Sequence, residues 1–417
     1  MTACGLDFGT SNTTLGTGEG GTPVLVTLEG EHRTIPSAIF FGADGHVVIG
    51  RNAMQAYVEG VPGRLMRSLK SVLGTALIDE TTRVGRERRG FRDVIAAYLS
   101  AIKRRAEAAT GREFTKLVHG RPVHFVDGSP EANRRAETTL REIASELGFT
   151  DVTFQFEPIA AALDYERDVT SEQIALIADI GGGTSDFSIV RLGAGRQNRA
   201  DREDDILAND GIRIGGTDFD RQLSLCAVMP LLGYRSPMLR AGLDVPSRYY
   251  HELATWSEIN RLYDAKVLGE LRQVRREAAH PELLDRLIRV IDEQRGHTLA
   301  MDVEAAKIAL TEKPRSAVPM SWIEPDLAVK VSGAELAKHT RLLADRVAGR
   351  IKLCLRHAQL QAEAIDAVML TGGSIRLTHL RKAITQALPN ARVVEGDIFG
   401  AVGKGLALEA ARRYGPA

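Results

Sequence analysis

Two segments of the chain share one plan, and this internal repeat constrains the fold more than any other feature. In residues 5–15 and again in residues 177–190, a strand ends in an aspartate, a glycine turn carries hydroxyl side chains, and a second strand returns. Glycine permits turn conformations that other residues avoid. It also leaves room for a phosphate to approach main-chain N–H groups. Each hairpin is therefore a candidate phosphate site.

The side chains of the two hairpins suit a magnesium-bound phosphate. Magnesium keeps several waters that need carboxylate acceptors, and we assign that role to Asp7 and Asp179. The hydroxyls that would donate to phosphate oxygens belong to Thr10, Ser11, Thr184 and Ser185.

A single hairpin of this kind is equally well explained as an aspartate-capped turn, because Asp and Gly are common turn residues. Two copies, followed by a third glycine turn at 371–374, favour nucleotide binding instead. No G-x-x-x-x-G-K-[ST] sequence occurs, and the glycine turns join strand to strand. Both observations disfavour a P-loop or a dinucleotide-binding motif.

Short apolar segments, glycine turns and amphipathic stretches alternate along the chain, as in an α/β fold. Apolar spacing predicts helices over residues 64–73, 91–102 and 131–147. Alternation then predicts a strand that runs into Glu157-Pro158. Because proline is tolerated at the first helical position, Glu157 is expected at a strand-to-helix corner.

The second half of the chain carries an arginine-rich, helical region at about 230–320, which we interpret as an insertion. Ser332 and Glu335 have capping-box spacing before a helix expected to end near Glu363. Residues 367–370 then form a buried strand that leads into the third glycine turn.

Composition restricts the class of protein. The 417 residues contain 54 Lys plus Arg and 54 Asp plus Glu, so no net field attracts nucleic acid or an anionic membrane. The three cysteines, Cys4, Cys226 and Cys354, lack the spacing of a zinc site or disulfide framework and are expected to be reduced, mostly buried thiols. No signal peptide and no run of about 20 apolar residues is evident, so a cytoplasmic location is expected.

At these residues the chain resembles the seventy-kilodalton (DnaK-type) heat-shock chaperone family, and especially its smaller YegD-like relatives. The resemblance covers essentially the whole chain as a nucleotide-binding domain. Six segments carry it in the family's order, namely GLDFGTSN (5–12), GRPVHF (120–125), FEPIAAAL (156–163), DIGGGTSDFSIV (179–190), GGTDFD (215–220) and LTGGSIR (370–376).

The resemblance implies a ribonuclease-H-like, actin-type ATPase fold, with two lobes that each hold a mixed sheet and with the nucleotide in the cleft. The expected first lobe is 1–172 plus 394–417, with a subdomain at about 34–112. The expected second lobe is 173–393, with a helical subdomain at about 214–332. Its cofactors would be ATP or ADP with Mg2+, and K+ is a further candidate ion.

The resemblance also implies residue roles. Lys70 would position the attacking water, and Glu157 and Asp179 would orient it, with Thr184 beside them. Taken without the resemblance, Lys70 is better explained as a solvent-exposed lysine on a helix. Asp7 and Asp179 would hold Mg2+ through water. The phosphate and nucleoside contacts would come from Gly9, Thr10, Ser11, Asn12, Gly181, Gly182, Gly183, Thr184, Gly215, Gly216, Glu304, Lys307, Thr311, Gly372, Gly373, Ser374 and Arg376.

Two departures from the family pattern affect these expectations. Ile308 stands where a base-stacking arginine is usual, although Arg376 could stack on the other face of the base. The family's linker and peptide-binding β domain are expected to be absent beyond Glu409. The first hypothesis is a chaperone-like ATPase whose conformational change is recognised by a client or co-chaperone. The alternatives are a sugar-type kinase that uses Asp186 and an actin-like filament-forming ATPase.

Overall fold

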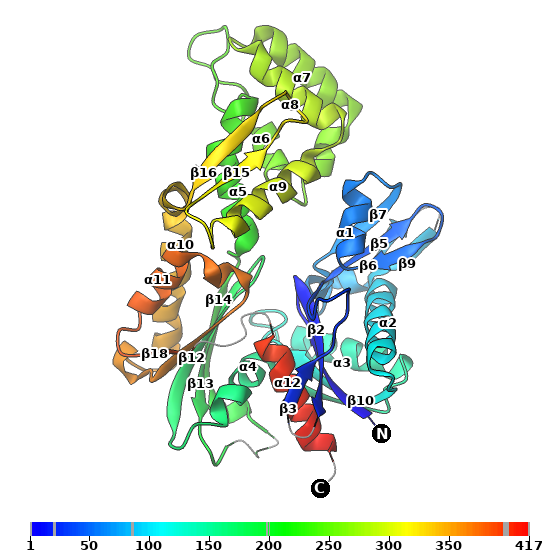
Figure 1. Cartoon of the computed structure of the whole chain (residues 1–417), viewed down its shortest axis with the longest axis vertical. Helices are drawn as coiled ribbons and strands as arrows, with labels where there is room; N and C mark the ends of the chain where they lie inside the picture. The colour runs from blue at the N-terminus through cyan, green and yellow to red at the C-terminus, as the bar shows by residue number, and fades with distance from the viewer. Residues whose placement is uncertain are drawn as a thin grey trace. The chain divides into compact units, whose positions relative to one another are not determined.

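The computed structural model describes residues 2–19, 22–84, 87–196, 199, 201–394 and 400–415. The chain divides into two compact units. Unit 1 comprises Met1–Arg213, Arg350–Ile375 and Thr385–Ala417, and unit 2 comprises Ile214–Gly349 and Arg376–Ile384 (Figure 1). Among the described residues, no helix is both long and apolar enough to span a bilayer.

The first sheet of unit 1 is built around strand β1. β1 pairs in parallel with β10 and antiparallel with β2. The strand order is β11 (Asp151–Phe156), β10 (Phe114–Arg121), β1 (Thr2–Phe8), β2 (Asn12–Glu19) and β3 (Thr22–Leu25), and β4 (Ile35–Pro36) also pairs with β2.

The second sheet of unit 1 repeats this plan around β12. β12 pairs antiparallel with β13 and in parallel with β17, as β1 does with β2 and β10. The strand order is β14 (Ile206–Ile212), β13 (Ser185–Leu192), β12 (Gln173–Ile180), β17 (Ala367–Thr371) and β18 (Arg392–Val394). The repeat predicted from the two hairpins thus extends to both mixed sheets.

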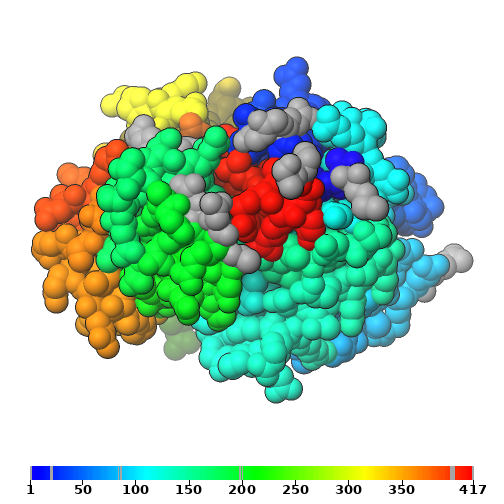
Figure 2. All heavy atoms as spheres, turned by 90° about the horizontal axis from the view of Figure 1, so that it is seen from below, coloured from blue at the N-terminus to red at the C-terminus, as the bar shows by residue number. Residues whose placement is uncertain are grey.

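Helices cover both faces of the first sheet. α2 (Phe91–Thr110) and α3 (Pro130–Glu146) bury their apolar faces against β1, β10 and β11 in one hydrophobic core. α12 (Ala401–Tyr414) packs on the opposite face, and its C-terminal turns reach the surface (Figure 2, red).

Two helices cross closely because both are lined by small residues. α4 (Glu157–Glu166) packs Ile159, Ala161 and Ala162 against the second sheet, whereas Ala160 faces α12. Where α4 crosses α12, a side chain at Gly405 would overlap the carbonyl oxygen of Ala160. Glycine is therefore required at this crossing.

The predicted helix over residues 64–73 is wrong. This segment forms strand β7 (Gly63–Arg67), then Ser68 in a left-handed conformation (φ 55°) and a short 3-10 helix, η1 (Leu69–Val72). β7 pairs with the fully buried strand β5 (Ala38–Gly42), which also pairs with β6 (Val47–Ile49) beside α1 (Arg51–Val58). Tertiary pairing here overrides the helical spacing of apolar residues. η2 (Ala76–Asp79) and the hairpin of β8 (Thr81–Val84) and β9 (Glu87–Gly90) complete this part of the chain.

The other predicted elements of the first half are confirmed. α2 and α3 contain the two remaining predicted helices, and β11 runs directly into α4 at Glu157, with Pro158 in the first turn. The three thiols are free, and Cys4 and Cys354 are buried.

Unit 2 is largely helical, as expected of the insertion. Its elements are α5 (Gly216–Leu223), η4 (Ser224–Val228), η5 (Met229–Leu232), α6 (Arg248–Leu253), η6 (Ile259–Tyr263), α7 (Ala265–Glu277), α8 (Pro281–Asp292), α9 (Gly296–Ala309), the hairpin of β15 (Arg315–Pro319) and β16 (Ala328–Ser332), and most of α10 (Gly333–His357) and α11 (Thr378–Gln386).

The predicted capping box at the start of α10 is present. The Glu335 amide donates to Ser332 Oγ, and the Ser332 amide donates to Glu335 Oε2. The helix ends at His357, earlier than predicted, and the short turn η7 (Ala362–Ala364) precedes β17. The predicted lobe boundaries at 172/173 and 393/394 stay a prediction, and residues 395–399 lie outside the described part.

Candidate nucleotide site

The two glycine hairpins of unit 1 lie at corresponding ends of the central strands. Asp7 is the last residue but one of β1, and Asp179 is the last but one of β12. A side chain at Gly182 in the second turn would overlap the hydroxyl of Ser11 in the first turn. The hairpin turns therefore approach each other directly at Gly182 and Ser11.

Lys70 and Glu157 form an ion pair beside the hairpins. Lys70 Nζ lies 2.5 Å from Glu157 Oε1, with side-chain exposures of 9% and 17%. Glu157 is placed by the corner between β11 and α4, and Lys70 by η1, whose Leu69 is buried in the adjacent core. The hypothesis of a solvated helical lysine is therefore wrong, since Lys70 is buried and does not lie in an α-helix.

The surrounding charges show that the two predicted aspartates belong to the same cluster as this pair. Burial and the negative charge of Glu157 raise the pKa of Asp7 to about 8, and Asp179 adds to the effect while Lys70 opposes it. Burial and Glu157 likewise raise the pKa of Asp179 above its usual range. Burial alone would lower the pKa of Lys70, but Glu157 and then Asp7 raise it.

Asp186 joins this cluster, although sequence reasoning considered it only as a kinase residue. It lies directly opposite Asp179 in the β12–β13 hairpin. Asp186 is solvent-exposed, so the negative charge of Asp179, more than burial, raises the pKa of its carboxyl above the usual range, while Thr184 Oγ1 donates a hydrogen bond of 2.8 Å to Asp186 Oδ2. The hairpin register could have indicated this pairing, because cross-strand neighbours project to the same face.

The carboxylates outnumber the positive charges in this cluster, which fits a cation. The cluster contains the acidic side chains of Asp7, Glu157, Asp179 and Asp186. Lys70 is the one cation among the described residues that lowers the pKa values of the three aspartates. In the described ranges, no group of three or more His, Cys, Asp or Glu residues could hold a metal directly.

Replacing Asp7 with asparagine is expected to stabilise the nucleotide-free chain at alkaline pH. The folded chain keeps the Asp7 proton up to about pH 8, whereas an unfolded carboxyl ionises near pH 4. Between about pH 4 and pH 8 the folded chain thus binds more protons than the unfolded chain, so the free energy of unfolding falls as the pH rises through this range. We expect Asp7→Asn to melt about 4 °C above the parent at pH 8, and the gap to close near pH 4.

Thermal melts of the nucleotide-free proteins from pH 4 to pH 9 would measure this effect. Asp164→Asn is the matched control, because the Asp164 side chain is 59% exposed and lies 3.8 Å from Arg167. A parent and an Asp7→Asn variant with parallel pH profiles would contradict the raised pKa.

The residues predicted to contact the nucleoside fall mostly in unit 2. Lys307 on α9 donates to the carbonyl of Gly216 (3.1 Å) and to Asp220 Oδ2 (2.8 Å), so it joins α9 to the start of α5. Ile308 is 51% exposed beside it. Gly215 precedes α5 as its N-cap residue.

Arg376 and Thr311 have partners of their own in unit 2. Arg376 Nη2 lies 3.1 Å from Glu312 Oε1, so its guanidinium is tied to the end of α9. Thr311 Oγ1 donates to the carbonyl of Ile308, and Glu304 lies one turn before Lys307 on α9. The roles of these residues toward a nucleoside stay predictions.

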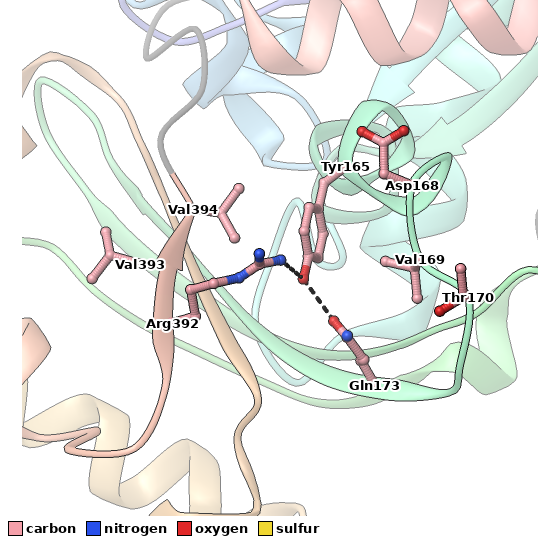
Figure 3. A pocket seen from close by; sticks show the side chains of 8 residues that line it. All are labelled: Tyr165, Asp168, Val169, Thr170, Gln173, Arg392, Val393 and Val394. Atoms are coloured by element: carbon pink, nitrogen blue, oxygen red, sulfur yellow. Dashed lines mark hydrogen bonds between the residues drawn. The ribbon is translucent and has the colours of Figure 1, made fainter.

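A pocket of about 520 Å³ in unit 1 is separate from the hairpin turns. The Tyr165 hydroxyl donates to Gln173 Oε1 (2.6 Å) and accepts from Arg392 Nη2 (2.7 Å) within it (Figure 3). Gln173 begins β12 and Asp179 lies near its other end, so about 20 Å of strand separates them. The pocket therefore contributes nothing to the nucleotide site.

Comparisons with known proteins identify the family of the chain. The "Hsp70 protein" family profile matches residues 3–228 and 287–415. The "Chaperone protein HscA homolog" of Chromobacterium violaceum is 26% identical over 428 aligned residues, which cover 98% of this chain and 58% of that relative. The chain thus spans somewhat over half the length of this relative. The repeated mixed sheets are those of the actin-like ATPase fold, and the chain belongs to the Hsp70 family.

Proposed function

We propose that the chain binds magnesium-ATP and hydrolyses it to ADP and phosphate as a chaperone-like ATPase. The observation that carries this proposal is the buried Lys70–Glu157 pair, which lies among the aspartates of two facing glycine hairpins. Phosphoryl transfer to water needs mainly positioning and charge stabilisation. These groups supply both.

The proposed roles follow from charge and position. Lys70 would neutralise the terminal phosphate, and Glu157 and Asp179 would orient the attacking water and take its proton. Thr184 would donate to the phosphate once it releases Asp186. Asp7 and Asp179 would hold the waters of Mg2+, and this ion would offset negative charge on the phosphate oxygens. K+ is a further candidate ion, which would balance the remaining negative charge of the cluster.

The remaining contacts divide between phosphate and nucleoside. The turn residues Gly9, Thr10, Ser11 and Asn12, with Gly181, Gly182, Gly183 and Thr184, would bind the phosphates. Those proposed for the nucleoside are Gly215, Gly216, Glu304, Lys307, Thr311, Gly372, Gly373 and Arg376, and Ser374 is proposed to act at the nucleotide site in general.

A chaperone-type role is supported by the family and by the name of the relative from Chromobacterium violaceum. In such a role the lobes 1–172 plus 394–417 and 173–393 would shift between open and closed populations, and a client or co-chaperone would respond to that shift.

Two measurements test the proposal. Melting temperature should rise with ATP or ADP, more with Mg2+ than without it, and less with GTP. Phosphate release from ATP should then occur with no other acceptor present. A magnesium-dependent melting shift without any phosphate release would reduce the proposal to nucleotide binding.

A kinase is the second candidate, because Asp186 is exposed beside Asp179, and a carboxyl whose pKa is raised suits a base that accepts a proton from a substrate hydroxyl. ATP consumption that depends wholly on one hydroxylated acceptor would favour this reading. ATP-driven light scattering that rises with protein concentration would instead favour a filament-forming ATPase.

A further inference from the structure

A buried serine braces the first hairpin turn. Ser37 directly follows β4 and is 2% exposed. Its amide donates to the carbonyl of Ser11 (2.9 Å), and its hydroxyl donates to the carbonyl of Gly9 (2.6 Å). A hydroxyl has one hydrogen, so the 3.0 Å contact between Ser37 Oγ and Thr13 Oγ1 must be a donation from Thr13. The Ser37 hydroxyl is therefore held in one orientation.

A second serine braces the other hairpin turn in the same way. Ser374 lies in η8 (Gly373–Arg376), the 3-10 turn that follows β17, and it is 8% exposed. Its hydroxyl donates to the carbonyl of Gly181 (3.0 Å). Gly372, at φ +82°, turns the chain into position; a side chain there would overlap the backbone of Ile180.

The two braces reach their hairpins from different places in the duplicated topology. Ser37 follows a strand that pairs with β2, on the antiparallel side of the first hairpin. Ser374 follows a strand that pairs in parallel with β12. Each serine nevertheless donates to the carbonyl of the first glycine in its turn. The repeat of the two sheets does not by itself explain this similarity, because the serines come from non-equivalent strands.

Binding that carbonyl sets the direction of the next amide. The peptide unit is planar and trans, so the C=O of one residue and the N–H of the next point in opposite directions. With the Gly9 carbonyl held by Ser37, the Thr10 N–H is directed away from Ser37. With the Gly181 carbonyl held by Ser374, the Gly182 N–H is directed away from Ser374.

We propose that Ser37 and Ser374 are paired positioning residues, each of which orients one turn peptide so that its N–H faces the phosphates of a bound nucleotide. The inference rests on the proposed nucleotide function and deepens it. It gives Ser37 a role that the sequence did not indicate. It also gives Ser374 a specific role at the nucleotide site, in which it acts through the carbonyl of Gly181.

The test compares ATP, ADP and AMP, because the turns are proposed to bind the phosphates beyond the first. Binding would be measured calorimetrically with Mg2+ for the parent, Ser37→Ala, Ser374→Ala and the double variant. Each single variant is expected to bind ATP and ADP about 5- to 20-fold more weakly, with AMP affinity changed less than about twofold. Ser145→Ala is the control, since the Ser145 hydroxyl donates to the carbonyl of Arg141 one turn earlier on the exposed face of α3.

Amide hydrogen exchange without nucleotide provides a separate measurement. Ser37→Ala should speed exchange in residues 9–12 and leave 181–184 unchanged, and Ser374→Ala should do the reverse. Equal weakening of all three nucleotides, or unchanged ATP affinity in both variants, would overturn the inference. A parent that binds no ATP would remove the proposed function itself, whereas unaltered exchange at both turns would remove only the serine braces.

Discussion

Replacing Lys70 with alanine is expected to lower ATP turnover about 100- to 1,000-fold, with the Kd for ATP changed less than about fivefold. Lys70 is held by Glu157 at 2.5 Å and is surrounded by the charges of Asp7 and Asp179. Its charge is therefore preorganised for the negative charge that develops on the transferred phosphate. An interaction made mainly in the transition state lowers the rate constant more than the affinity when it is lost.

Single-turnover phosphate release and direct ATP binding would separate these two effects. Lys103→Ala is the matched control, because Lys103 is also a partly buried lysine, 2.6 Å from Glu107. Asp179→Asn should reproduce the result for Lys70→Ala. Parental turnover in both Lys70→Ala and Asp179→Asn, or an affinity loss as large as the rate loss, would show that the site is wrongly assigned.

Replacing Arg202 with methionine is expected to destabilise unit 1 by about 3 to 5 kcal/mol. The Arg202 guanidinium donates to both oxygens of Glu166 at 2.9 Å and also to Asp205. All three side chains are at most 1% exposed. Without Arg202, Glu166 loses a buried ion-pair partner that reaches both of its oxygens. Glu166 is the last residue of α4, the helix that begins with Glu157.

Chemical denaturation would measure the loss. Arg167→Met is the control. Arg167 directly follows Glu166 in the sequence, but its side chain is 51% exposed and lies 3.8 Å from Asp164. A Glu166→Leu, Arg202→Met double variant should lose less stability than Arg202→Met alone, because it removes the buried carboxylate as well. Equal losses in Arg202→Met and Arg167→Met would show that the network contributes little.

Local sequence pattern predicted the elements whose signals are local. The strand-to-helix corner at Glu157-Pro158, the capping box of Ser332 and Glu335, and the two aspartate hairpins all depend on residues within a few positions of one another. The same reasoning was wrong over 64–73. The pairing of β7 with β5 determines the conformation of that segment. A local sequence pattern does not indicate a strand partner more than 20 residues away.

The sequence by itself determined that there are two phosphate-type hairpins, an α/β fold with a helical insertion, and a set of acidic residues suited to a metal-bound nucleotide. Only the tertiary structure decided which distant groups share one environment: it buried Lys70 against Glu157, and it brought Ser37 to the first turn. The physical reason is that backbone conformation and capping depend on neighbours along the chain. The pKa of a carboxyl and the direction of a braced peptide depend on groups that only folding brings within a few ångströms.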